Sequence, residues 1–216
     1  MQSQSVCPAC SIINYEDPYN TFFKSNIAYL MCGNCRTIFS GALDNSNKVG
    51  GNEEISRNMA SNHERVFRIF ELLSGASQPH AVLDYGCGNG YLVNDLSRNQ
   101  AMLAFGYDKY SDKHNYIPHI QFDVITMIEV IEHMSAPFED LAEIYRLLTP
   151  GGFLMIETSF TDIADEEGTP YNCFEYINPD LGHCTIFSHK GLDLLLKRFG
   201  FELNNVINRN VRIYRK

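Results

Sequence analysis

Two pairs of cysteines near the start of the sequence have the spacing of a metal site. Cys7 and Cys10 form one C-x-x-C pair, and Cys32 and Cys35 form a second pair about twenty residues later. Four thiolates at this spacing can close a tetrahedron around Zn²⁺. So short a segment buries little core, so the metal would supply its folding energy. A redox role would need one C-x-x-C beside a βαβ unit, whereas this segment has two such pairs. We therefore predict a zinc-ribbon-like domain over residues 1–45.

A second group of side chains combines carboxylates with imidazoles. Glu129, Glu132 and His133 directly follow a buried apolar stretch, and His183 comes shortly before a helical pattern. Such groups can act as general bases or hold a divalent cation. We predict that these four residues are catalytic. Whether Mg²⁺ or Mn²⁺ binds them stays open, as does a structural role in which they only orient a loop.

The third chemical feature is a glycine-rich segment, Asp-Tyr-Gly-Cys-Gly-Asn-Gly at residues 84–90. Glycines allow a tight turn and a close approach of backbone to ligand, and Asp108, at the end of the next strand, can accept hydrogen bonds from two ribose hydroxyls. A dinucleotide loop would read G-x-G-x-x-G and bring a helix N-terminus against a pyrophosphate. The acidic residue before G-x-G-x-G suits a cationic cofactor without phosphate, which favours S-adenosylmethionine (SAM).

Alternating helical and strand patterns from residue 53 onward position these side chains. We expect strands at residues 81–85, 101–107, 122–128, 153–158, 201–207 and 210–214, and helices at 55–74, 138–148 and from the N-cap Ser188 to Gly200. This order predicts an α/β fold with a mainly parallel sheet and helices on both faces. The glycine-rich segment, Asp108 and the segment 129–133 each follow the end of an expected strand. Sheets of this kind bind ligands at these strand ends. The polar stretch 44–52 is a predicted linker between a first domain and a second domain over 53–216.

Several segments together resemble the class I SAM-dependent methyltransferases. These are Leu-Asp-Tyr-Gly-Cys-Gly-Asn-Gly at 83–90, Asp108, the stretch 122–133, and Leu-Leu-Thr-Pro-Gly-Gly at 147–152. The resemblance implies a Rossmann-like, seven-stranded sheet that ends in an antiparallel hairpin. It also implies SAM binding by Asp84, Tyr85, Gly86, Cys87, Gly88, Gly90, Tyr91, Asp108, Lys109, Met127, Ile128 and Glu129.

The segment after Asp108 departs from that family. The family usually fits a helix, a third strand and an adenine-contacting acid there, whereas residues 109–121 are too few for them. We therefore expect the third strand to be missing or rudimentary. Either residues 110–120 form a loop over the adenine ring, or the adenine pocket is more open than usual.

The sequence Glu-Val-Ile-Glu-His at 129–133 resembles the E-V-x-E-H segment of ubiquinone-pathway O-methyltransferases, and with His183 it resembles the Mg²⁺ or Mn²⁺ site of small-RNA 2′-O-methyltransferases. A zinc ribbon before a methyltransferase domain also resembles enzymes that methylate nucleotide-linked or glycan sugars. These resemblances imply transfer of a methyl group to a hydroxyl of a small molecule, such as a sugar or sugar nucleotide. The alternatives are an RNA-modifying methyltransferase whose ribbon docks RNA, and a SAM-binding protein without catalysis.

Charge and composition narrow the partners. The chain of 216 residues has 17 Lys and Arg against 26 Asp and Glu, a net charge of −9, which argues against nucleic acid as the main partner. No apolar run approaches the ~20 residues that cross a bilayer, and no apolar signal core follows the polar first residues. We expect a cytoplasmic protein with no membrane partner, and the sequence indicates no oligomeric state.

Overall fold

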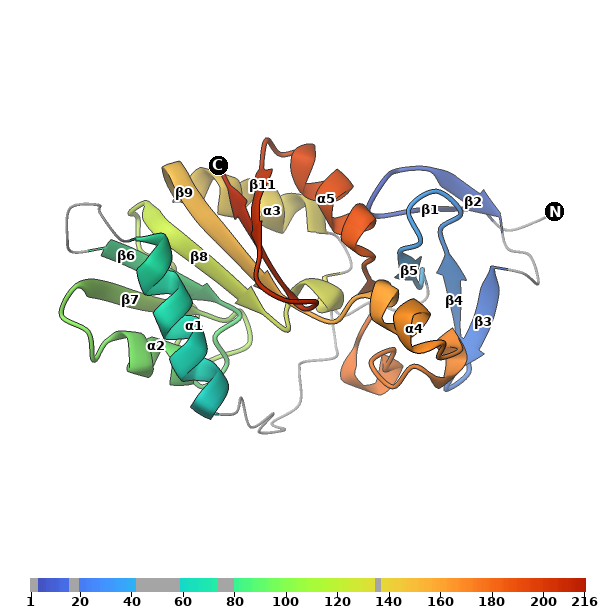
Figure 1. Cartoon of the computed structure of the whole chain (residues 1–216), viewed down its shortest axis with the longest axis horizontal. Coiled ribbons are helices and arrows are strands. Elements are labelled where there is room, and N and C mark those ends of the chain that lie inside the picture. The colour runs from blue at the N-terminus through green and yellow to red at the C-terminus, as the bar shows by residue number, and fades with distance from the viewer. Residues whose placement is uncertain (1–3, 16–19, 42–58, 74–79, 135–136) are drawn as a thin grey trace.

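The computed structural model describes residues 4–15, 20–41, 59–73, 80–134 and 137–216. Figure 1 shows a large sheet with helices beside it and, next to this, a smaller lobe that contains the N-terminal strands. The predicted linker at 44–52 and the domain boundaries at 45 and 53 lie outside the described residues.

The large sheet has six strands in the order β11-β12-β9-β8-β6-β7. Their bounds are β6 His80–Tyr85, β7 Met102–Tyr107, β8 Phe122–Ile128, β9 Leu148–Glu157, β11 Glu202–Val206 and β12 Val211–Arg215. The pairs β6–β7, β6–β8 and β8–β9 are parallel, whereas β12 pairs antiparallel with both β9 and β11. The predicted mainly parallel sheet with a C-terminal antiparallel hairpin is therefore confirmed.

Two layers of helices explain why the parallel strands are mostly apolar. The helices are α1 Met59–Leu72, α2 Tyr91–Leu96, α3 Pro137–Leu147 and α5 His189–Lys197. Leucine and isoleucine side chains of α3 and α5 share one core with β6, β8 and β9, and those of α1 and α2 share another with the same strands. A strand covered on both faces reads as a continuous apolar run, and β8 is buried at every position except Asp123.

Among the described residues, the large sheet has one strand fewer than the resemblance implies. Only residues 108–121 connect β7 to β8, and they contain no helix or strand. A chain of this length can cross over β6 but cannot also build a helix and another strand. The implied seventh strand is therefore wrong for this chain, the expectation of a missing third strand is confirmed, and β7 is an edge strand.

The smaller lobe has a sheet that combines distant parts of the chain. Its order is β10-β5-β4-β3, with β3 Thr21–Lys24, β4 Ile27–Met31, β5 Ile38–Phe39 and β10 Thr185–Ile186. A separate ribbon pairs β1 Gln4–Val6 with β2 Ile13–Tyr15. The segment beside this lobe forms α4 Thr161–Glu167 and the 3-10 turns η2 Tyr171–Cys173 and η3 Pro179–Leu181. The segments predicted as two domains thus share one sheet.

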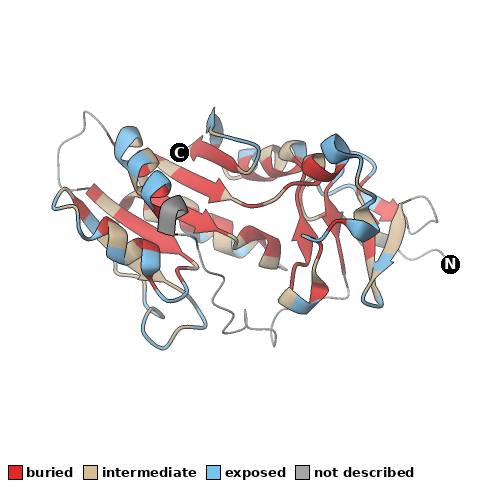
Figure 2. Ribbon diagram, turned by 60° about the horizontal axis from the view of Figure 1, so that its bottom comes forward, coloured by how far each residue is buried: buried red, intermediate tan, exposed pale blue. Residues whose placement is uncertain are grey.

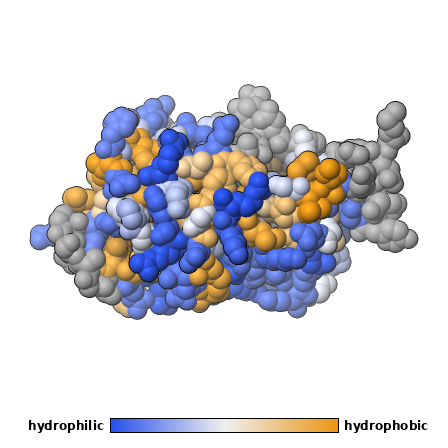
Figure 3. Space-filling view, turned by 90° about the horizontal axis from the view of Figure 1, so that it is seen from above, coloured by the Kyte–Doolittle hydropathy of each residue, from blue (hydrophilic) through white to orange (hydrophobic). Residues whose placement is uncertain are grey.

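Burial follows these layers. Figure 2 shows buried residues along the central strands of the large sheet. The strands β6, β8 and β12 are buried at most positions, whereas the edge strand β11 is exposed throughout. On the face seen in Figure 3, hydrophobic residues form separate patches between hydrophilic ones. None of the helices in the described ranges is long and apolar enough to span a membrane.

Candidate active site and thiol cluster

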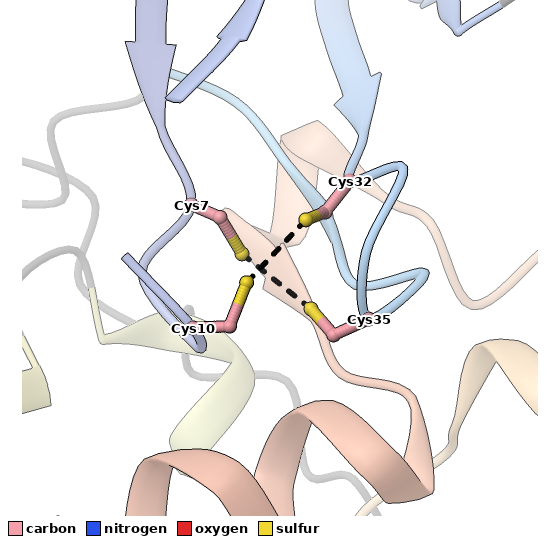
Figure 4. Close-up of side chains that lie close together, drawn as sticks. All are labelled: Cys7, Cys10, Cys32 and Cys35. Carbon is pink, nitrogen blue, oxygen red and sulfur yellow. Dashed lines mark hydrogen bonds between the residues drawn. The ribbon is translucent and has the colours of Figure 1, made fainter. Parts of the chain in front are cut away.

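The structure brings the four predicted zinc ligands together (Figure 4). The Sγ atoms of Cys7 and Cys35 lie 3.6 Å apart, those of Cys10 and Cys32 lie 3.5 Å apart, and all four are within 4.8 Å of one another. A tetrahedral Zn²⁺ with Zn–S bonds of about 2.3 Å requires S–S separations of about 3.8 Å. The cluster therefore has the donor type and the size for one zinc ion.

Two equivalent turns present these thiols. Ser11 N donates to Cys7 O at 2.9 Å, and Arg36 N donates to Cys32 O at 2.8 Å. Each turn ends on a residue with positive φ, 60° at Ser11 and 61° at Arg36. The second turn directly follows β4 and leads into β5, so the thiol cluster holds together the β4–β5 connection.

The glycine loop turns from β6 into α2 through three left-handed residues. Gly86, Gly88 and Gly90 have φ of 79°, 52° and 76°, a region that glycine enters at no steric cost. A Cβ on Gly86 would lie 2.3 Å from Val130 Cγ2, whereas a Cβ on Gly88 would meet nothing within 4 Å. The loop therefore packs tightly on the segment after β8 at Gly86 and is open at Gly88.

Asp108 is attached to this loop. Its carboxylate accepts a hydrogen bond from Gly88 N at 3.0 Å and one from Tyr110 N at 2.9 Å. Each carboxylate oxygen keeps a further acceptor position, and the residue is half-buried. Asp84, in contrast, is fully buried and accepts from Thr126 Oγ1 at 2.8 Å.

The other predicted cofactor-binding residues differ in exposure. Met127 and Ile128 are fully buried, so neither offers surface to a cofactor in this structure. Cys87 and Tyr85 are also buried, and the Tyr85 hydroxyl lies 3.0 Å from Asp140 Oδ1. Tyr91 and Lys109 are exposed.

The segment that replaces the third strand folds back on the glycine loop. His114 O accepts from Asp108 N at 2.7 Å. A Cβ on Gly90 would lie 2.8 Å from His114 Nε2, so the imidazole covers this glycine. Ile117 packs on the core beneath. Residues 109–121 thus form a loop without helix or strand, and its contact with the glycine loop had no signal in the sequence.

The four predicted catalytic residues meet around a tyrosine that the sequence did not indicate. Tyr176 Oη lies 2.8 Å from Glu129 Oε2 and 2.6 Å from Glu132 Oε1. The imidazole rings of His133 and His183 pack on each other beside these side chains, with their centroids 4.7 Å apart. The His183 ring also lies 4.7 Å from the Tyr176 ring. We call Glu129, Glu132, His133, Tyr176 and His183 the acid–histidine cluster.

Burial sets the protonation of this cluster. It raises the pKa of Glu129 to about 8, with a further contribution from the negative charge of Glu132, and it also raises the pKa of Glu132. The same burial lowers the pKa of His133 and lowers that of His183 to about 4, keeping both imidazoles neutral. Because the Tyr176 hydroxyl has one proton for two carboxyl groups, one carboxyl must itself be protonated for both contacts to be hydrogen bonds.

Part of the cluster has the geometry of a cation site. One ligand atom each of Glu132, His133 and His183 lies within 4.8 Å of the others. His183 Nδ1 is 2.5 Å from Tyr176 O, which leaves Nε2 as the acceptor nitrogen once Nδ1 carries the proton. Glu129 lies outside this set among the described residues.

A buried ion pair links α1 to the end of β9, and the sequence did not indicate it. Arg65 donates to Glu157 at 2.6 Å and 2.8 Å, and its side chain is 9% exposed. Asn62 Oδ1 accepts from the same guanidinium at 2.8 Å. The pair borders a cavity of about 150 Å³ between α1 and the C-terminal hairpin, which does not include the glycine loop.

Comparison with known proteins identifies the class. A methyltransferase-domain family matches residues 53–206, most of the chain, so the chain belongs to this family of SAM-dependent methyltransferases. An S-adenosylmethionine-dependent methyltransferase of Mycolicibacterium smegmatis is 25% identical over 160 residues, which are 64% of this chain and 58% of that protein. The ubiquinone/menaquinone biosynthesis C-methyltransferase of Ralstonia pickettii is 27% identical over 124 residues, 45% of this chain and 51% of that protein. The chain spans about half the length of these relatives.

Solved structures agree on the fold. The 1,6-didemethyltoxoflavin-N1-methyltransferase of Burkholderia thailandensis has a TM-score of 0.52 at 15% identity, covering 91% of this chain and 99% of that chain. The amino pentose methyltransferase of Micromonospora echinaspora has a TM-score of 0.50 at 13% identity, covering 71% and 91%. The predicted Rossmann-like methyltransferase fold is confirmed.

Proposed function

We propose that the chain transfers the methyl group of SAM to a hydroxyl of a small molecule, such as a sugar or sugar nucleotide. One observation carries this proposal: the glycine loop packs directly beside the acid–histidine cluster. Gly86 packs on Val130 so closely that a Cβ would overlap it, and Val130 follows Glu129 directly. A cofactor on the glycine loop would therefore lie beside a group of carboxyl and imidazole side chains.

The residues of the loop fit SAM. Gly88 leaves open space where a side chain would project, and Asp108 retains acceptor positions for a ribose diol. The acidic neighbours suit the cationic sulfonium, and no basic side chain is among the residues that we assign to the loop. Bound SAM supplies an activated methyl group with its own leaving group. What remains for the protein is to orient the acceptor and remove its proton.

Glu129 or His133 would remove that proton. A hydroxyl is a weak nucleophile until it is deprotonated, and a base is most effective when its pKa lies near the working pH. Glu129, with a pKa raised to about 8, meets this requirement, and burial lowers the pKa of His133, which leaves a neutral imidazole that can accept a proton. Glu132 is fully buried, and Thr158 donates to it at 3.1 Å, so we assign it and His183 to orienting the cluster.

The same cluster supports binding of a divalent cation as a further element of this function. Two imidazoles and one carboxylate are a donor set that suits Mn²⁺ better than Mg²⁺, which prefers oxygen ligands. Such a cation would be held by Glu132, His133 and His183 and would polarise the acceptor hydroxyl, and Glu129 rather than His133 would then be the base. Occupancy of the thiol cluster by a structural Zn²⁺ is part of the proposal, because Cys7, Cys10, Cys32 and Cys35 fill all four positions.

The test is methyl transfer from ¹³C-methyl SAM to a panel of sugars, sugar nucleotides, small phenols and transfer RNA. We expect an O-methyl product from one of the small molecules, no label in the RNA, and at least a hundredfold slower transfer in Glu129→Gln or His133→Gln. Glu139→Gln, an exposed acid on α3, is the matched control and should keep full activity. A C-methyl or RNA product would refute the proposed acceptor, and full activity of both Glu129→Gln and His133→Gln would refute the proposed base.

A further inference from the structure

The sheet that contains the thiol cluster continues into the acid–histidine cluster. β10 pairs antiparallel with β5 through Thr185 and Ile186. One residue further along, Ser40 N donates to Cys184 O at 2.9 Å. Cys184 N in turn donates to Glu132 O at 2.9 Å. Backbone hydrogen bonds therefore run without interruption from β5 to Glu132.

A second connection runs from β4 to His183. The hydroxyl of Tyr29 donates to His183 O at 2.7 Å, and the Tyr29 side chain is fully buried. On the neighbouring strand, Lys24 Nζ donates to Phe174 O at 2.6 Å. Both contacts hold the segment 174–183, which has little regular secondary structure of its own and which includes Tyr176.

Part of the thiol cluster lies at the turn between β4 and β5. Cys32 directly follows β4, and its amide donates to Thr37 O at 2.8 Å, just before β5. A metal bound by Cys32 and Cys35 would thus fix the β4–β5 turn. The glycine loop, in contrast, is held by hydrogen bonds from Gly86 N and Cys87 N to Tyr107 O at the end of β7, and by the packing of Gly86 on Val130.

We propose that the sheet β3-β4-β5 is the frame that positions the acid–histidine cluster, with Tyr29 as a positioning residue that acts through the backbone of His183. Metal in the thiol cluster then controls the order of Glu132, Tyr176 and His183 but not the binding of SAM. The catalytic consequence rests on the proposed function, whereas the structural coupling does not.

Amide hydrogen exchange tests the coupling without any acceptor. In Tyr29→Phe, which keeps the ring and loses the hydroxyl, we expect exchange in peptides over 174–186 to rise about fivefold, the effect of one lost hydrogen bond. Peptides over 80–90 should exchange as in the wild type, with bound zinc and SAM affinity unchanged. Removing zinc with a chelator should raise exchange over 174–186 by a larger factor.

Tyr214→Phe is the matched control. Tyr214 is also buried, and its hydroxyl lies 2.7 Å from Asp193 Oδ1 on α5, away from the acid–histidine cluster. Lys24→Met is a second variant that weakens the same segment from β3 and covers the case in which Tyr29→Phe does not fold. Exchange over 174–186 that is no faster in Tyr29→Phe and Lys24→Met than in Tyr214→Phe would overturn the proposal. Because no methyl transfer is measured, a wrong choice of acceptor cannot produce this result.

Discussion

Alanine at Gly86 and at Gly88 should separate the two tasks of the glycine loop. Both residues are left-handed, with φ of 79° and 52°, so either alanine has the backbone cost of about 1–2 kcal/mol for an L-residue in this region. A Cβ at Gly86 would also lie 2.3 Å from Val130 Cγ2, and overpacking a buried contact costs a further 1–3 kcal/mol, roughly. A Cβ at Gly88 meets nothing within 4 Å.

We therefore expect Gly86→Ala to lower the free energy of unfolding by about 2–5 kcal/mol and Gly88→Ala by only about 1–2 kcal/mol. For SAM affinity we expect the opposite order, with the larger loss in Gly88→Ala, because the Gly88 Cβ would project into the space that we assign to the cofactor. Gly88→Ala should raise the Kd for SAM roughly tenfold or more.

Urea denaturation followed by circular dichroism gives the unfolding free energies, and isothermal titration calorimetry gives the SAM affinities of the folded variants. Equal destabilisation by the two alanines would refute the packing of Gly86 on Val130. Wild-type SAM affinity in Gly88→Ala would refute the placement of the cofactor over Gly88.

Three further predictions follow from the site. Arg65→Met should lower the free energy of unfolding, measured by urea denaturation, by about 3 kcal/mol, because it leaves the half-buried carboxylate of Glu157 unpaired. The double variant Arg65→Met with Glu157→Gln should recover part of this loss. An unchanged free energy of unfolding in Arg65→Met would contradict a stabilising role of the ion pair. The pKa of Glu129 is raised from 4.5 to about 8, so the folded state holds a proton that the unfolded state releases, and this stabilisation is complete below pH 4.5 and is lost as the pH rises through 8. The urea midpoint should therefore fall less between pH 5 and pH 8 in Glu129→Gln than in the wild type. An equal fall in both proteins would argue against the raised pKa. We expect mass spectrometry under native conditions to find one zinc per chain, and Cys35→Ser should abolish this zinc and lower the melting temperature. Cys173→Ser, at an exposed thiol outside the cluster, should change neither the zinc content nor the melting temperature. A zinc-free wild type would contradict the assignment.

The features that could be predicted from the sequence are those with a local signal. The strand at 122–128 has the predicted bounds, because a run buried on both faces has no charged interruption other than Asp123. Ser188 caps α5 as expected, accepting from Gly191 N at 2.8 Å. The spacing of the C-x-x-C pairs was sufficient to predict that Cys7 and Cys35 lie close together.

The features that were missed depend on contacts between distant residues. β10 has two residues, too few for any periodicity, and its pairing with β5 joins segments nearly 150 positions apart. Tyr176 reaches Glu129 and Glu132 across 47 and 44 positions from a stretch without a regular pattern. The seven-stranded sheet was a property of the resembling family, and the short connection after Asp108 prevents it here.

The most direct test of the account is calorimetric titration of SAM into the wild type and Asp108→Ala. We predict one SAM per chain and an affinity at least about thirtyfold lower in the variant, because two hydrogen bonds to a charged group are lost. Asp108→Asn, which keeps an acceptor oxygen, should fall between the two. No binding of SAM by the folded wild type, or equal affinity in all three proteins, would contradict the account.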